Sequence, residues 1–219
     1  MKILSVCLVV ASLPLFDGCA AMSKKHTYTA PAEVPDAIKV TTDFGDKIRG
    51  NWILVLDDSI STAKRSNLKP DGLVCSGHDF VFDASEAIAI SARKMAAQLF
   101  DTVTETKEMP TFQATSSNGF VGATVVKLDD FSPRFTCGPA GAKVEGWCSA
   151  SAVISLTVTL VQSKTGLARR SFSVSSQRWS EGPEGNLCSG ALTVLSHATS
   201  RAAKDVFEEA AQRVVTMAK

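Results

Sequence analysis

The sequence is poor in the residue types that most often carry catalysis and metal binding. It contains three histidines, and they are scattered, at His26, His78 and His197. A Ser-His-Asp constellation or a histidine-rich metal site therefore has little support. The sequence has no C-x-x-C pair, which argues against a thioredoxin-like redox site. We expect no metal, no other cofactor and no enzymatic activity.

An excess of charge of one sign is also missing. The 23 Lys and Arg residues nearly balance the 22 Asp and Glu residues, which leaves a formal net charge of +1. No basic run occurs, and 11 Phe against one Tyr form an aromatic set suited to a core more than to base stacking. Nucleic-acid binding therefore lacks electrostatic support, and we expect no nucleic-acid partner.

The third absence is a hydrophobic run long enough to cross a membrane. The uncharged stretch Ile3–Phe16 follows the positive Lys2 and ends at Asp17. It is shorter than the roughly 20 apolar residues that a membrane-spanning helix needs. No later segment approaches its length. The pattern predicts an export signal peptide.

The residues Phe16, Asp17, Gly18 and Cys19 resemble the lipobox of bacterial lipoprotein signals, although an acid at Asp17 departs from it. The resemblance implies removal of residues 1–18 and attachment of lipid, palmitate included, to Cys19. Because Ala20 follows the cysteine, the enterobacterial sorting rule points to the outer membrane, facing the periplasm. The alternative is an ordinary signal-peptidase cut after Gly-Cys-Ala or Cys-Ala-Ala, which would remove Cys19.

Four cysteines remain in either case, and an even number in an exported chain favours disulfides. Three pairings are possible. We predict Cys137–Cys148 across a short Gly-rich excursion. We also predict Cys75–Cys188, because both of these residues precede helices and would meet at one end of the domain. Cys75 and His78 also form a C-x-x-H half of a zinc site, but oxidation of the cysteine is the better use.

The chain divides into a signal peptide (1–18), a flexible tether (19–49) and a single domain (50–219). The tether is polar and proline-containing and shows no hydrophobic period. Within the domain the patterns predict two helices and a series of strands. The helices fall within 85–101 and 191–217. The strands fall at 51–58, 78–83, 102–107, 123–131, 152–162 and 168–178.

The fold class that follows is α+β. Strand 152–162 alternates apolar and hydroxyl side chains and forms a hairpin with 168–178. We expect a mainly antiparallel, twisted sheet of about four to five strands with two helices on one face.

The hairpin "AVISLTVTLV", "SKTG", "RRSFSVSSQR" and the terminal amphipathic helix resemble a group of small envelope lipoproteins. The group includes the YajG-type family, the lipopolysaccharide-assembly lipoprotein LptE and auxiliary lipoproteins of ABC lipid transporters. The resemblance covers roughly residues 125–215. It implies a non-enzymatic partner in envelope assembly or lipid transport.

An acyl-enzyme of the penicillin-binding type is a remote alternative. Ser61–Lys64 matches S-x-x-K, 116–118 matches S-x-N, and 164–166 matches K-T-G. That chemistry needs Ser61 and Lys64 one turn apart on a helix, and the segment instead reads as a loop.

Two pairs of adjacent acids end predicted strands, at Asp57-Asp58 and Asp129-Asp130. Adjacent residues in a strand point to opposite faces, so we expect capping or turn roles for them rather than a shared site. Trp147 and Trp179 are the candidate partner-binding residues, because the sequence pattern predicts both in Gly-rich loops beside Cys148 and Cys188. The alternative role for the two tryptophans is to cap the open end of the layers. The sequence therefore predicts an envelope protein that acts by binding an unidentified partner, or else a lipid or small-ligand module that uses a cleft between helices and sheet.

Overall fold

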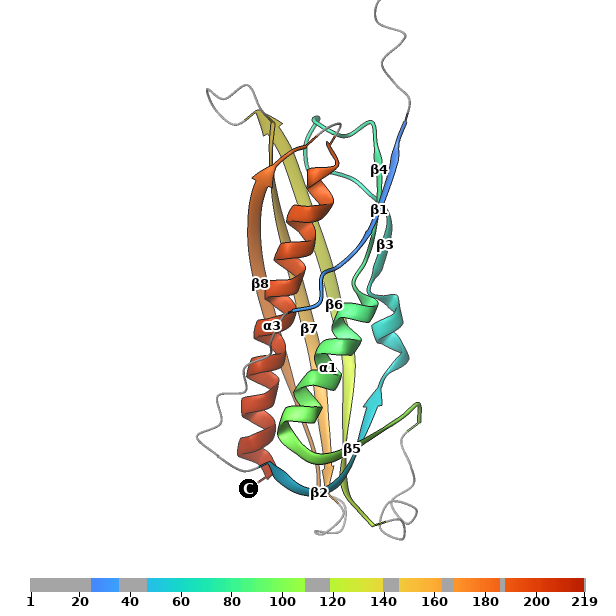
Figure 1. Ribbon diagram of the computed structural model, residues 1–219, viewed down its shortest axis with the longest axis vertical. Coiled ribbons are helices and arrows are strands. Elements are labelled where there is room, and N and C mark those ends of the chain that lie inside the picture. The colour runs from blue at the N-terminus through green and yellow to red at the C-terminus, as the bar shows by residue number, and fades with distance from the viewer. Residues whose placement is uncertain are drawn as a thin grey trace, which may run out of the picture.

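The computed structural model describes residues 25–35, 47–108, 119–139, 146–162, 168–185 and 188–218. In these ranges the protein is an elongated α+β structure whose long axis follows three long strands (Figure 1). No helix in the described ranges is long and apolar enough to span a membrane.

The main sheet has five strands in the order β5–β2–β6–β7–β8. Its strands are β2 (Ile48–Leu56), β5 (Phe100–Thr106), β6 (Phe120–Pro139), β7 (Gly146–Gln162) and β8 (Ala168–Pro183). The ladders β6–β7 and β7–β8 are antiparallel, whereas β2 runs parallel to both β5 and β6. The predicted α+β class is confirmed. The predicted antiparallel arrangement, however, holds only for β6, β7 and β8, because β2 is parallel to both of its neighbours.

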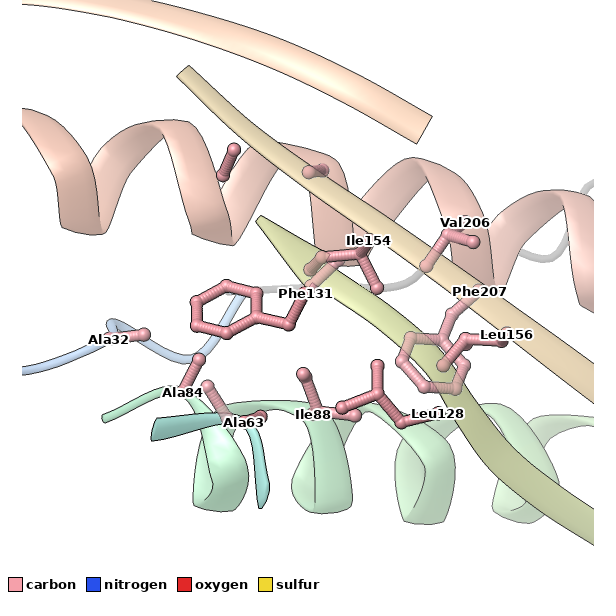
Figure 2. Packing of buried hydrophobic residues seen from close by; sticks show 14 of the residues in the cluster. Ala32, Ala63, Ala84, Ile88, Leu128, Phe131, Ile154, Leu156, Val206 and Phe207 are labelled. Carbon is pink, nitrogen blue, oxygen red and sulfur yellow. The ribbon is translucent and has the colours of Figure 1, made fainter. Parts of the chain in front are cut away.

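The helices α1 (Ser85–Leu99) and α3 (Gly190–Ala218) cover one face of this sheet (Figure 1). The inner stripe of α3 is rich in alanine, which lets the helix approach the sheet closely. Figure 2 shows the packing between the layers. The side chains labelled there are buried, and they are Ala32, Ala63, Ala84, Ile88, Leu128, Phe131, Ile154, Leu156, Val206 and Phe207.

The alternation in β7 decides which face is covered. Ile154, Leu156 and Val158 are fully buried against the helices. Ser155 and Thr157, between them, lie on the opposite face and are partly exposed. Since side chains alternate along a strand, this one pattern orients the whole antiparallel half of the sheet.

The start of α1 carries the D-x-x-E pattern of a capping box, from Asp83 to Glu86, and the structure uses one half of it. Asp83 does accept hydrogen bonds, from the backbone N–H of Ser85 (3.0 Å) and from its hydroxyl (2.6 Å). The second member of the box, Glu86, instead forms an ion pair with Arg93 at 3.4 Å. The N-cap residue of α1 is Ala84, and Asp83, one position earlier, accepts from the first N–H of the helix.

A second sheet has three strands in the order β1–β4–β3. Its strands are β1 (Thr27–Pro31), β3 (Lys64–Leu68) and β4 (Asp79–Asp83), and a short 3-10 helix, η1 (Asp58–Thr62), precedes β3. Phe80 and Phe82 on β4 are completely buried. Their rings meet those of Phe135 and Phe131 on β6, at centroid distances of 4.8 and 6.3 Å. These aromatic contacts join the small sheet to the main core.

β1 lies inside the segment 19–49 that the sequence predicts to be tether. Tyr28 stacks on Phe80 at 5.3 Å between ring centroids. The amine of Lys25 contacts the carboxylate of Asp79 at 2.5 Å. β1 pairs with β4, which is distant in the sequence, so the local sequence pattern does not predict a strand here. The described structure therefore begins at Lys25, six positions after Cys19.

Two arginines of α3 reach the free edge of β8. The guanidinium of Arg201 donates to the carbonyl of Trp179, and that of Arg213 donates to the carbonyl of Ser173, both at 3.2 Å. β8 is a terminal strand of the main sheet. These two bonds therefore occupy carbonyl groups that would otherwise stay open along the edge.

Candidate functional site

Two disulfides lie in the described structure, and they are the pairs expected from the sequence. Cys75 is bonded to Cys188 across 113 positions, with 5.9 Å between Cα atoms. Cys137 is bonded to Cys148, which faces it directly in the β6–β7 ladder, with 4.1 Å between Cα atoms. The first bond fastens the loop between β3 and β4 to the start of α3. The second closes the end of the β6–β7 pair.

The surroundings of the first disulfide contain the one group of possible metal ligands found in the described ranges. The carboxylate of Glu184 lies 3.1 Å from the sulfur of Cys188 and 3.5 Å from that of Cys75. The three ligand atoms lie within 4.8 Å of one another. Because the two sulfurs are bonded to each other, they are not thiolates, and the carboxylate is the single anionic donor left. The geometry therefore supports a structural role for this group.

Trp179 is the most exposed aromatic side chain of the described structure, at 61% of its surface. It lies in β8, opposite Ser151 of β7, and its side chain points to the sheet face away from the helices. The expected position in a Gly-rich loop is wrong, because β8 continues to Pro183. A strand holds the indole more firmly than a loop would, which suits an anchor for a partner.

On one side of Trp179 the outer face of the sheet is hollowed. The hollow has a volume of about 390 Å³. Its walls combine charged, hydroxyl and aromatic groups: Asp71, Asp130, Ser132, Arg134, Phe135, Thr136, Ser149, Ser151, Val153, Gln177 and Trp179. Of these residues, Ser149 and Ser151 belong to β7 and Trp179 to β8. This is a shallow polar groove with one large aromatic surface.

On its other side Trp179 borders a second hollow of about 410 Å³, shared by β8 and α3. Arg178, Arg201, Lys204 and Asp205 complete its lining. Arg178 forms an ion pair with Asp205, and Arg201 is held by the Trp179 carbonyl. Trp179 therefore lies between the polar groove and a second, basic groove, and its side chain lines both.

Trp147 is less exposed, at 39%. It lies at the start of β7, opposite Gly138 of β6 and Pro183 of β8. This residue too lies in a strand and not in a loop. Trp147 and Ser151 are four residues apart on one face of β7, and Trp179 is opposite Ser151. Both tryptophans therefore lie on the outer face of the sheet, separated by about 14 Å along the strand direction.

The outer face next to the groove carries a ladder of hydroxyl groups. Each pair joins β7 to β8 by a hydrogen bond: Ser155 with Ser175 (2.7 Å), Thr157 with Ser173 (3.0 Å) and Thr159 with Ser171 (2.8 Å). The sequence signal for this ladder was the alternation of Ser and Thr in both strands. Each pair uses the O–H of one hydroxyl and the oxygen of the other, so this part of the face is polar and links the two strands.

The residues of the acyl-enzyme alternative make separate local contacts and do not form the arrangement that this chemistry needs. Ser61 is in η1, where its hydroxyl donates to the carbonyl of Asp58 at 2.6 Å. Lys64 begins β3 and pairs with Asp83 at 3.7 Å. Ser61 therefore does not start an α-helix that would carry the lysine one turn later. The other two boxes, 116–118 and 164–166, lie outside the described residues.

The paired acids serve local structure. Asp57 caps η1 by accepting from the N–H of Ser59 at 2.9 Å, and the hydrogen bonds from Ser59 hold the pKa of Asp57 below its ordinary value. Asp129 accepts from Thr157 at 2.6 Å. Asp130 accepts from the hydroxyl of Ser132 (2.8 Å), and it also lines the polar groove.

Comparison with known proteins gives no family. No family model matches the sequence, and no curated protein matches it. Solved structures do match in the path of the chain. A Xanthomonas campestris protein of the family DUF330 is 13% identical, with a TM-score of 0.46 over 86% of this chain and 93% of that one.

Two further matches are weaker. A predicted neuraminyllactose-binding hemagglutinin homolog from Helicobacter pylori is 8% identical, with a TM-score of 0.39 over 81% of this chain and 91% of that one. A predicted lipoprotein from Caulobacter crescentus is 11% identical, with a TM-score of 0.29 over 46% of this chain and 68% of that one. At these scores the chains share only part of their path. The function is therefore argued below from the residues of this chain.

Proposed function

We propose that this protein is a lipid-anchored protein of the bacterial cell envelope that acts by binding, as an accessory or assembly component of an envelope or transport complex. The observation that carries the proposal is the order of features along the chain. A predicted export signal ends at a lipobox-like Cys19, and the described structure begins six residues later at Lys25. Two disulfides, which form in an oxidising compartment, support the same address.

The binding surface in this proposal is the outer face of β7 and β8 around Trp179. A large, rigid aromatic beside a polar groove and a basic groove is typical of an interface anchor. The alternative, a lipid cavity between helices and sheet, has less support. Val126, Leu156, Val206 and Phe207 are fully buried in that space and fill it.

The anchor is tested by the intact mass of the protein from the membrane fraction. Acylation at Cys19 would give a chain that begins at this cysteine and carries the added mass of acyl groups. The Cys19→Ala variant would then leave the membrane fraction. A soluble chain that begins at Ala21 or Met22 would refute the anchor.

The binding face is tested by crosslinking in intact envelopes. We expect Trp179→Ala to remove the main crosslinked partner, whereas the matched Ser175→Ala, an exposed substitution on the same strand, should keep it. Since Trp179 is 61% exposed, its removal should lower the free energy of unfolding by about 2 kcal/mol at most, so that the variant stays folded. An unchanged partner in folded Trp179→Ala protein would remove this face from the proposal.

A further inference from the structure

One end of the elongated domain gathers several chain segments that are distant in the sequence. We call it the tether end. It comprises the starts of β1 and β4, the loop 69–78, the β6–β7 end at Cys137–Cys148, the end of β8 and the start of α3 (Figure 1). The Cys75–Cys188 disulfide ties the loop to the helix at this end.

Exposed large apolar side chains concentrate at the tether end. Four such side chains occur in the described residues, and three of them are here: Leu73 at 93% exposed, Val74 at 36% and Trp147 at 39%. The fourth is Trp179. Apolar groups that are grouped at one end of a soluble domain mark a surface with a partner.

The structure holds Leu73 outward. On one side of it, the N–H of Asp71 donates to the carbonyl of Phe135 in β6 at 2.8 Å. On the other side, the hydroxyl of Ser76 donates to the carbonyl of Leu73 itself at 2.7 Å, and Cys75 is fixed by its disulfide. The backbone around Leu73 is therefore tied on both sides, and the exposed side chain is presented on a supported loop.

The short stretch of chain between Cys19 and Lys25 limits how far the tether end can lie from a membrane that holds Cys19. Six positions separate Cys19 from Lys25, and an extended chain spans at most about 3.5 Å per residue, or about 21 Å in total. Lys25 is fixed at the tether end, because its amine contacts Asp79 at the start of β4. An acyl group on Cys19 would hold this end, and not the opposite one, next to the bilayer.

We propose that the tether end docks on the membrane surface and places Leu73, Val74 and Trp147 in the lipid interface. The inference rests on the proposed lipid anchor at Cys19 and adds the orientation of the domain and a second membrane contact. Tryptophan and aliphatic side chains favour the interfacial region of a bilayer, where an indole has both apolar and polar neighbours. Trp179 lies further along the strands and would stay in water, available to a protein partner.

The test uses the full chain, purified from membranes and reconstituted in vesicles of phosphatidylethanolamine and phosphatidylglycerol. A fraction of the lipid carries bromine near the glycerol end of the acyl chains, where it quenches indole fluorescence on contact. The Trp179→Phe variant keeps two tryptophans: Trp147, which is exposed, and Trp52, which is buried at 1% exposure. The matched control, Trp147→Phe, leaves Trp179 instead.

We expect brominated lipid to lower the Trp147 emission about twofold and to leave the Trp179 emission unchanged. Leu73→Asp, an exposed substitution that leaves the disulfide in place, should weaken the quenching of Trp147. Acylated, vesicle-bound protein whose Trp147 is not quenched would overturn the inference and keep the anchor; a protein partner at this end would give that result. Unacylated protein whose Trp147 is quenched when vesicles are added would keep the inference and refute the anchor.

Discussion

The two disulfides differ in what they constrain, and this difference can be measured. Cys75–Cys188 closes a loop of 113 positions, and Cys137–Cys148 closes one of 11. The chain-entropy model gives losses of about 4.8 kcal/mol and about 2.8 kcal/mol in the free energy of unfolding when each bond is removed. Cys137 and Cys148 also face each other in an intact ladder, which keeps them close without the bond. We therefore expect the Cys75→Ala/Cys188→Ala variant to be the weaker protein by about 2 kcal/mol.

The assay is equilibrium urea unfolding of the two double variants beside the wild type, with unfolding followed by tryptophan fluorescence and by circular dichroism. Each variant keeps the other disulfide, so mispairing of single thiols does not arise. The m value, which is the steepness with which the free energy of unfolding falls with urea concentration, should be larger in both variants than in the wild type. The reason is that an unfolded chain with one disulfide fewer is more expanded. A Cys137→Ala/Cys148→Ala variant that loses as much free energy as Cys75→Ala/Cys188→Ala, or more, would refute the reasoning from loop length.

Two more predictions concern packing and pH. A methyl group on Gly122 would lie 2.5 Å from the Trp52 ring and from the Val161 carbonyl, whereas Gly138 on the same strand has open space. Gly122→Ala should therefore lower the free energy of unfolding by about 1–3 kcal/mol, Gly138→Ala should be close to neutral, and equal effects in urea unfolding would contradict this. Hydrogen bonds from Lys25, and secondly from Lys69, hold the pKa of Asp79 below its ordinary value of 3.8. The ionised Asp79 carboxylate therefore contributes fully to the free energy of unfolding above pH 3.8, and this contribution is lost as the pH falls through the lower pKa of the folded state. Asp79→Asn should remove this part of the acid destabilisation, and an unchanged pH dependence of the urea midpoint between about pH 5 and about pH 2 would contradict it.

Much of the antiparallel half of the fold could be predicted because its signals are local. The alternation around Ile154 and Leu156 identifies a strand with one buried face without knowledge of its partners. The long helix α3 has its own apolar period. The number of cysteines left three pairings open, and the placement of the cysteines beside these elements predicted the pairing that the structure shows.

β1 and the full length of β6 could not be predicted, because distant partners decide them. β1 is a five-residue strand whose burial alternates only weakly, and it forms by parallel pairing with β4 more than 50 positions later. β6 runs through Pro133, which in a central strand would cost a ladder bond. The carbonyls of Phe131 and Phe135 on either side of it bond to Arg65 and to the N–H of Asp71, away from β7. Pro133 therefore turns its missing N–H to that same side, where no β7 bond is lost.

Of the residues around the two hollows, the sequence predicted a binding role for Trp179 alone, and Trp147 lies further along the same face. The sequence predicted Trp147 and Trp179 as partner-binding residues or as caps of the open end of the layers. It placed them in loops, because the glycines and prolines nearby usually end strands. The basic hollow beside Trp179 depends on Arg201, which approaches from α3 only when the helix packs on the sheet. Such a contact between separate elements leaves no sequence pattern.

The arginines at the edge of β8 have a consequence for how this sheet can grow. A free strand of this length offers a row of backbone groups on which another chain could assemble. Arg201 and Arg213 come from the helix that packs on the sheet, so they arrive at the edge only once α3 has docked. Docking of the helix therefore places two cations and two occupied carbonyls along this edge, and a chain whose α3 is not docked would present the same edge without them.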